Sequence, residues 1–153
     1  MSVNSEAAVC ALHALASADM DTLERLYSPD FVFHLRVSNR PQGYAGLRDR
    51  ALLINSALYD ASVAVKVVLD DDDTVVTRWR GTAVHKGDLC GFAATGHRVD
   101  VTGITIFRLR DGAITDEWTE FDALGLLSQL RPTPVPAVPA VPAVRPAAVA
   151  ARG

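Results

Sequence analysis

The first third of the chain changes twice between helical and strand-like spacing of its apolar residues. From Ser5 to Tyr27 apolar positions recur every three to four residues, with a break near Asp19, which predicts a helix followed by a shorter helical piece. The segment 31–37, FVFHLRV, alternates between two sets of positions and predicts a strand. After the break at 40–43, helical spacing returns, and a third helix is predicted from Gly46 to Leu58.

The rest of the pattern is strand-like and is divided by turn signals. Strands are predicted over 62–69, 74–86, 98–110 and 113–122, with a glycine-containing loop at 87–96. Asp70–Asp73 forms the first turn, and Asp111-Gly112 is the two-residue signal of a tight hairpin. Helices followed by a series of strands indicate an α+β fold, with three N-terminal helices packed in the concave face of a curved antiparallel sheet.

The composition changes abruptly after Leu130. The segment from Arg131 onward contains six of the eight prolines and repeats Pro-Ala-Val three times. Proline removes an amide donor and fixes φ, so this segment is predicted to be extended polyproline II or disordered. We therefore expect a folded domain at 1–130 and a tail at 131–153. A solvated tail is favoured over a ligand for a proline-binding groove.

Charge and hydrophobicity exclude several classes of partner. The chain is 49% apolar and 22% charged, which is typical of a globular domain, and it contains no run of about 20 apolar residues. The start of the chain lacks the basic cluster of a secretory signal, so we expect a cytoplasmic protein with no membrane partner. The net charge is −3, and because residues 131–153 contribute three arginines and no acid, residues 1–130 carry −6. A nucleic-acid partner is therefore not expected.

The sequence also offers few residues for a metal or nucleotide. Cys10 and Cys90 have neither the spacing of a cysteine metal site nor the density of a disulfide-rich domain. The run Asp70–Asp73 lacks the spaced ligands and the glycine of a calcium loop, which favours a solvated turn. The patterns GxSxG, GxGxxG and HExxH and the P-loop are absent. No metal and no cofactor are predicted.

The part of the chain from Trp79 onward carries a series of motif residues in preserved order and spacing. They are Gly81-Thr82, His85, Gly87, Gly91, Thr95-Gly96, Gly103-Ile104, Phe107-Arg108, Asp111-Gly112 with Ile114, Trp118, and Asp122 leading into Leu124-Gly125-Leu126 and Gln129-Leu130. Together with Leu26–His34 and Gly46-Leu47 upstream, the series resembles the SnoaL-like polyketide cyclases over nearly all of residues 5–130.

The resemblance implies a cone-shaped α+β barrel of the nuclear-transport-factor-like kind, with a cavity between the concave face of the sheet and the helices. It implies a reaction without a cofactor, a homodimer or homotetramer formed through the sheet, and Asp122 as the general acid and base. Many relatives place a histidine directly after the threonine, whereas Ala83-Val84 separate Thr82 from His85 here. Because this cone hosts cyclases, epoxide hydrolases, isomerases and proteins without catalysis, the resemblance specifies the fold better than the reaction.

The predicted hairpin places two acids on one face of the sheet. If Asp111-Gly112 is a two-residue turn, Arg110 faces Ala113 and the pairing follows by counting back. One face then carries Val101, Gly103, Thr105, Phe107, Leu109, Ile114, Asp116, Trp118, Glu120 and Asp122. Glu120 and Asp122 lie about 7 Å apart on this face, where burial and like charge favour protonation of one of them. A bulge in either strand would exchange the faces, and curved sheets often contain one.

The predicted roles follow from this face and from the resemblance. Asp122 is the predicted base and later the acid, and Glu120 either tunes it or faces solvent at the rim. Trp118 is interpreted as a pocket wall rather than a donor, and His34 as either a donor or a surface histidine. The predicted substrate-binding residues are Trp118, Phe33, Phe107, Thr105 and His85. The apolar walls are predicted to be Phe31, Phe33, Leu53, Phe107 and Leu109.

Three functional hypotheses follow. The first is a cofactor-independent cyclase that closes a ring in a polyketide-type natural-product intermediate by aldol-type acid/base catalysis. The second is an epoxide-opening enzyme of the same fold, in which Arg78 or Arg80 steadies the acid if these side chains point inward. The third is a non-catalytic ligand-binding module whose tail contacts a partner protein.

Overall fold

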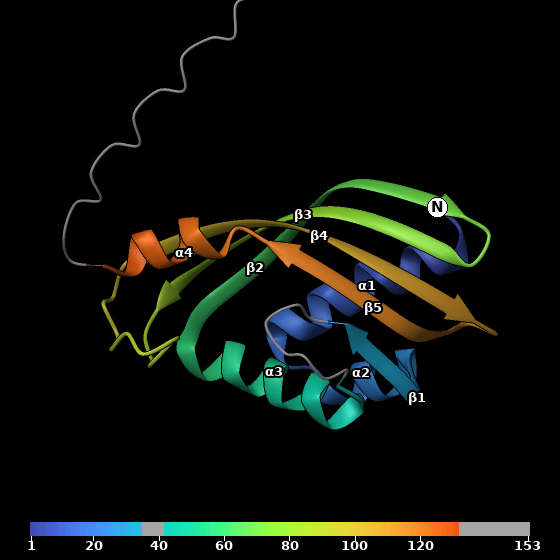
Figure 1. The fold of residues 1–153 in the computed structure, drawn as a ribbon, viewed down its shortest axis with the longest axis horizontal. Coiled ribbons are helices and arrows are strands. Elements are labelled where there is room, and N and C mark those ends of the chain that lie inside the picture. Colours follow the sequence, from blue (N-terminus) through green and yellow to red (C-terminus); the bar gives the residue numbers. More distant parts are fainter. Residues whose placement is uncertain (35–41, 132–153) are drawn as a thin grey trace, which may run out of the picture.

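The computed structural model describes residues 1–34 and 42–131, so most of the predicted tail and the end of the first predicted strand lie outside the described residues. The described part contains four helices and five strands (Figure 1). The helices are α1 (Val3–Ser17), α2 (Met20–Leu26), α3 (Tyr44–Ala57) and α4 (Ala123–Leu130). The strands are β1 (Tyr27–His34), β2 (Leu58–Asp71), β3 (Thr74–His85), β4 (Arg98–Arg110) and β5 (Ala113–Phe121). No helix in these two ranges is long and apolar enough to cross a membrane.

The five strands form one curved sheet in the order β1-β5-β4-β3-β2, and α1, α2 and α3 lie in its concave side (Figure 1). This arrangement confirms the predicted α+β class. The prediction of a purely antiparallel sheet is wrong at one edge, because β1 pairs with β5 in parallel. The two strands are separated by most of the chain, so no hairpin forces them to run in opposite directions. The fourth helix, α4, was not predicted.

The predicted break near Asp19 is a pair of helix caps. Ala18 ends α1 in the left-handed conformation, with φ of 53°, and its N–H bonds to carbonyls of the last turn. The Asp19 side chain then accepts a hydrogen bond from the N–H of Thr22 and begins α2. The two helices can therefore change direction while both ends keep hydrogen-bond partners.

The buried apolar side chains form two clusters at different places along the sheet. The first joins the three N-terminal helices to the middle of the sheet through residues that include Leu12, Leu23, Leu47, Phe31, Phe33, Val75, Phe107 and Ile114. The second lies where α4 meets the sheet and contains Ala57, Ala83, Leu89, Val99 and Leu130. The apolar side chains of α4 thus close a separate part of the core, which explains why a helix follows β5.

The hairpin between β4 and β5 contains a bulge that reverses the predicted face of β5. Asp111 and Gly112 both have positive φ, and the predicted pairs beside this turn are confirmed. Beyond the turn, Leu109 pairs with Ile114 but Arg108 pairs with Asp116, so Thr115 is an extra residue. One extra residue exchanges inward and outward positions along the rest of the strand.

The bulge makes the predicted face wrong for the β5 residues beyond it. Phe107 pairs with Glu117, Thr105 with Thr119, and Gly103 with Phe121, so these β5 residues share the concave face with β4. The other face carries Asp116, Trp118 and Glu120, which had been expected to point toward the helices. The assignment for β4 itself is correct, because Phe107 and Thr105 are buried and Ile104 and Ile106 are exposed.

Candidate active site

The concave face holds one buried carboxylate, Glu117, whose side chain is only 1% exposed. Tyr27 Oη donates to its Oε2 over 2.8 Å, and Arg50 Nη2 donates to its Oε1 over 2.8 Å. Thr119 Oγ1 also donates to Oε1 over 3.0 Å. Strand β5 thus supplies the acid, the start of β1 supplies the tyrosine and α3 supplies the arginine. The two carboxylate oxygens thus accept three hydrogen bonds from three different elements.

Burial of Glu117 requires these partners, because a buried charge without a partner is strongly destabilising. The Arg50 guanidinium balances the charge and also lies over the Phe33 ring, 3.9 Å from its centroid. Burial, together with the neighbouring Glu117 charge, raises the pKa of Tyr27 well above its ordinary value. Tyr27 therefore keeps its proton at neutral pH and remains a donor to Glu117.

Glu117 is connected to the half-buried part of the concave face by a chain of hydroxyl groups. The hydroxyl oxygens of Thr105 and Thr119 lie 3.0 Å apart, and Trp79 Nε1 donates to Thr105 Oγ1 over 3.0 Å. Thr105 is fully buried, whereas Thr119 and Trp79 are partly exposed. This polar relay, Trp79-Thr105-Thr119-Glu117, runs from a partly accessible surface to a buried charge.

On the concave face, the space beside Gly103 is occupied by the Trp79 ring. A Cβ atom at Gly103 would lie 2.8 Å from Cε2 and from Cη2 of Trp79, so a larger residue cannot fit without displacing the ring. Glycine at this position therefore allows the indole to lie against β4 and reach Thr105.

Four of the predicted site residues do face the helices. Phe33 and Phe107 are buried in the first core cluster, so they are packed walls. Thr105 belongs to the polar relay. His85 is fully buried at the end of β3, where its Nδ1 lies 3.0 Å from Thr95 Oγ1, and its Nε2 has no partner among the described residues. The predicted wall residue Leu53 is 51% exposed and does not belong to this core.

Two predicted residues come together on the opposite side of the sheet. The His34 and Trp118 rings stack with centroids 4.5 Å apart, and the Arg108 guanidinium lies 5.2 Å from the Trp118 ring. His34 Nε2 lies 3.0 Å from Asp116 Oδ1. Burial acts to raise the pKa of Asp116, but hydrogen bonds from His34 and Thr115 outweigh it and hold the pKa below its ordinary value. His34 is therefore hydrogen-bonded to Asp116 on the outer face.

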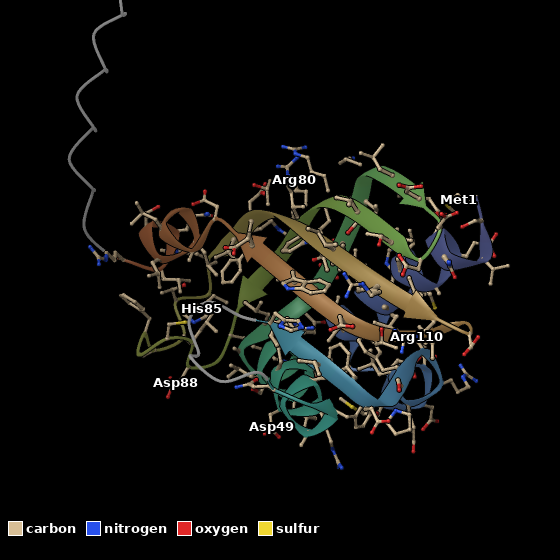
Figure 2. All side chains as sticks on the ribbon, turned by 45° about the vertical axis from the view of Figure 1, so that its right-hand side comes forward. Met1, Asp49, Arg80, His85, Asp88 and Arg110 are labelled. Carbon is tan, nitrogen blue, oxygen red and sulfur yellow. The ribbon has the colours of Figure 1, made fainter. Side chains whose placement is uncertain are left out.

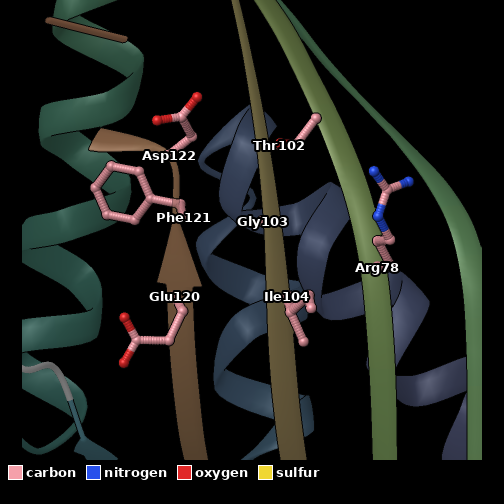
Figure 3. A pocket seen from close by; sticks show the side chains of 7 residues that line it. All are labelled: Arg78, Thr102, Gly103, Ile104, Glu120, Phe121 and Asp122. Atoms are coloured by element: carbon pink, nitrogen blue, oxygen red, sulfur yellow. The ribbon is translucent and has the colours of Figure 1, made fainter. Parts of the chain in front are cut away.

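Glu120 and Asp122 also lie together but outside the helix-lined face. Both line an open groove, which also contains Arg78, Thr102, Gly103, Ile104 and Phe121 (Figure 3). In this view the helices lie behind the sheet. Asp122 is exposed and forms the N-cap of α4 by accepting a hydrogen bond from Gly125 N over 2.8 Å. Its predicted place in an apolar cavity is wrong, while its catalytic role stays a prediction.

Sequence reasoning missed Glu117, Thr119, Tyr27, Arg50 and Trp79. Arg50 had a usable signal, because it lies three residues after Leu47 and four before Ile54, on the apolar side of the predicted helix. A charged residue at such a position indicates a buried partner. Within the residues that the structure describes, no group of three or more His, Cys, Asp or Glu side chains could hold a metal ion.

Comparison with known proteins gives one family and many similar structures. Residues 6–130 match the model of the SnoaL-like polyketide cyclase family. IdmH, a "putative polyketide cyclase" from Streptomyces antibioticus, is 27% identical with a TM-score of 0.74, over 83% of this chain and 97% of that chain. A "putative polyketide cyclase" from Acidithiobacillus ferrooxidans is 25% identical with a TM-score of 0.74, over 85% and 95% of the two chains. AclR, a "putative hydroxylase" from Streptomyces galilaeus, shares the fold at 24% identity, with a TM-score of 0.75 over 83% and 94%. No curated protein matches the chain.

Proposed function

Because the chain belongs to the SnoaL-like polyketide cyclase family, we propose that it closes a ring in a polyketide-type intermediate by acid/base catalysis on the concave face of its sheet. The observation that carries this proposal is the polar relay from Trp79 to Glu117. It connects a buried carboxylate to partly exposed groups on the face that the helices line. The outer-face acids Glu120 and Asp122 have no such enclosed surroundings.

Aldol-type ring closure removes a proton from a carbon beside a carbonyl and joins that carbon to a second carbonyl carbon. The oxygen of the second carbonyl then takes up a proton and becomes a hydroxyl group. In the proposed reaction, Thr119 passes its hydroxyl proton to Glu117 while it accepts the proton from the substrate, and the same route later returns the proton. No further reactant is needed: while Glu117 holds the proton, the negative charge lies on the substrate enolate, and when the proton is returned Arg50 again balances the carboxylate.

The proposed substrate region lies between the two core clusters. Trp79 packs against the first cluster but remains partly exposed, and Phe121, which shares the concave face with Thr119, is 40% exposed. The Trp79 ring lies against Gly103, and Gly103 pairs with Phe121 on β5. In the proposed binding mode, these two aromatic side chains offer an apolar surface for a folded carbon chain whose reacting carbon lies near the Thr119 hydroxyl.

An isotope experiment tests this reaction class. The purified protein is incubated with a linear poly-β-ketone in water enriched in ¹⁸O, after dialysis against a chelator. The proposal predicts ring closure with no solvent oxygen in the new ring hydroxyl group. Incorporation of ¹⁸O at that hydroxyl beyond the carbonyl exchange measured in substrate without protein, or activity that returns only with added metal or nucleotide, would contradict it.

Epoxide opening is a second candidate, and one observation favours it. The reaction needs a carboxylate steadied by an arginine, and Arg50 with Glu117 forms such a pair on the concave face. Arg78 and Arg80 do not meet the condition of pointing inward, because both are exposed on the other face. Arg80 (Figure 2) is paired there with Asp100. An epoxide substrate converted with one ¹⁸O atom from solvent would identify this reaction.

Self-association through the sheet, expected from the family resemblance, is proposed for the outer face. Ile104 is 46% exposed there and pairs with Arg78 on one side and Glu120 on the other. Ile106, 36% exposed, lies in the next row. A second copy rotated by 180° about an axis parallel to β4 would place its Arg78 over Glu120 and its Ile104 over Ile104. The row formed by Arg78, Ile104 and Glu120 is thus self-complementary in charge and hydrophobicity.

Charge reversal at this row is expected to weaken the dimer. Arg78→Glu places like charges opposite each other twice in a symmetric pair, so the dissociation constant should rise tenfold or more, by roughly 1.4 kcal/mol or above. Sedimentation velocity over a concentration series measures it. The double variant Arg78→Glu/Glu120→Arg should restore association. A monomeric wild-type protein, or a dimer unchanged by Arg78→Glu, would contradict this interface.

A further inference from the structure

Arg50 uses only part of its hydrogen-bonding capacity on Glu117. A guanidinium carries its N–H donors in one plane, and Nε–H forms a fork with one Nη–H that can hold two acceptor oxygens. Arg80 uses this fork on Asp100, because its Nε and Nη2 both donate to the carboxylate. Among the described residues, Arg50 donates to Glu117 through Nη2, and its buried Nε has no acceptor. One arm of the Arg50 fork is therefore open.

The open N–H of Arg50 is the donor beside Glu117 that another molecule can satisfy. Tyr27 has one O–H, which it donates to Glu117, and Trp79 has one N–H, which it donates to Thr105. The Phe33 ring covers a face of the Arg50 guanidinium and leaves the donor directions in its plane unchanged. A buried donor without an acceptor is unfavourable, so binding of an acceptor oxygen at Nε is favoured.

This donor lies within reach of a substrate at Thr119. Arg50 Nη2 and Thr119 Oγ1 bind the same oxygen of Glu117, over 2.8 Å and 3.0 Å, so they are at most about 6 Å apart. The oxygen of a ketone lies about 2.4 Å from the carbon next to its carbonyl group. A substrate whose reacting carbon is about 3–3.5 Å from the Thr119 hydroxyl can therefore place its carbonyl oxygen at the Arg50 guanidinium.

We infer that Arg50 is a catalytic residue, whose Nε–H binds the substrate carbonyl oxygen on which the enolate charge develops. The inference rests on the proposed function and deepens it, since it names the substrate group that is bound, a ketone beside the reacting carbon. That carbon gives its proton to Thr119 while Thr119 passes its own to Glu117. The electron pair of the broken C–H bond forms the enolate, and the negative charge moves from Glu117 to the carbonyl oxygen, where Arg50 stabilises it.

The balance of charge supports this position of the carbonyl oxygen. Among the described residues, Glu117 is the only acid that forms an ion pair with Arg50, whose side chain is 20% exposed. An enolate formed away from Arg50 would leave this guanidinium without a counter-charge once Glu117 holds the proton. Such an uncompensated charge is strongly unfavourable. An enolate at Nε keeps the charge of Arg50 paired throughout the reaction.

A 1,3-diketone, benzoylacetone, tests the inference in full-length protein, because its enolate absorbs at longer wavelength than its neutral form. Glu117→Gln removes the negative charge beside Arg50, so this variant should bind the probe as the enolate. One pH unit below the solution pKa of the probe, the ratio of enolate to neutral probe should be roughly tenfold or more higher in the bound than in the free probe. In wild type, where Glu117 already pairs with Arg50, the ratio should be lower.

A probe that stays neutral or unbound in folded Glu117→Gln, or an equal ratio in both proteins, would overturn the inference. Glu117→Gln/Arg50→Met removes both charges and should return the ratio to that of the free probe. Bound enolate in this double variant would also overturn the inference. Glu117→Gln/Arg48→Met is the matched control, since Arg48 is exposed on the same helix, and should keep the high ratio. Failure of the proposed function has a different signature, because Glu117→Gln would then retain turnover whatever the spectrum shows.

Discussion

Replacing Glu117 by glutamine is expected to reduce turnover of a polyketide-type substrate by about 10²- to 10⁴-fold, the usual contribution of a positioned acid or base. Glutamine keeps the size of the side chain and can still accept a hydrogen bond from Thr119 or Arg50, but it cannot accept the substrate proton. The measurement is the single-turnover rate of ring closure, followed by mass spectrometry, at saturating protein.

A second variant distinguishes loss of the acid/base group from a folding defect. Glu117→Gln leaves Arg50 without its counter-charge, so its folded state is checked by circular dichroism and thermal unfolding. Thr119→Val breaks only the connection between the substrate region and Glu117, and keeps the ion pair with Arg50. It should also slow ring closure strongly. Folded variants that both turn over at the wild-type rate would refute the assignment of Glu117.

Replacing Arg50 by alanine is expected to lower the free energy of unfolding by about 3–5 kcal/mol. The substitution leaves Glu117 buried as an unpaired charge and also removes the guanidinium from the Phe33 ring. Urea unfolding monitored by circular dichroism gives the difference. Arg48→Ala is the matched control, because Arg48 is exposed on the same helix and should change stability by less than about 0.5 kcal/mol.

A double substitution distinguishes an uncompensated charge from simple loss of packing. Replacing both partners with apolar residues of similar volume, Arg50→Met with Glu117→Leu, removes the buried charge together with its counter-charge. Such exchanges are often neutral or stabilising, so the double variant should regain most of the stability lost in Arg50→Ala. A loss below about 1 kcal/mol in Arg50→Ala would show that Glu117 does not depend on this ion pair.

The sequence predicted most of the elements because their signals are local. Helical spacing located α1 and α3, and the predicted strand 98–110 matches β4. Asp111-Gly112 forms the predicted turn with two positive φ angles. The inward face of β4 was also predicted correctly, because a strand alternates faces with a period of two. These features depend on residues that are neighbours in the chain.

The candidate site was predicted poorly because it depends on one local irregularity and on distant contacts. The extra residue Thr115 exchanges the faces of β5, so Trp118 and Glu120 were expected on the face that Glu117 and Thr119 occupy. Strand alternation alone cannot locate a bulge. The partners of Glu117 are 67 and 90 residues away, at Arg50 and Tyr27, and no spacing rule connects them.

The most direct test of the central claim, that acid/base catalysis occurs on the concave face, is the turnover of Asp122→Asn measured beside wild type. Asparagine is as good an N-cap as aspartate, so α4 should remain formed while the titrating proton is removed. The predicted result is ring closure at nearly the wild-type rate. A folded Asp122→Asn protein whose turnover falls by 10²-fold or more, at the scale of a lost acid or base, would contradict the claim and return the role to Asp122.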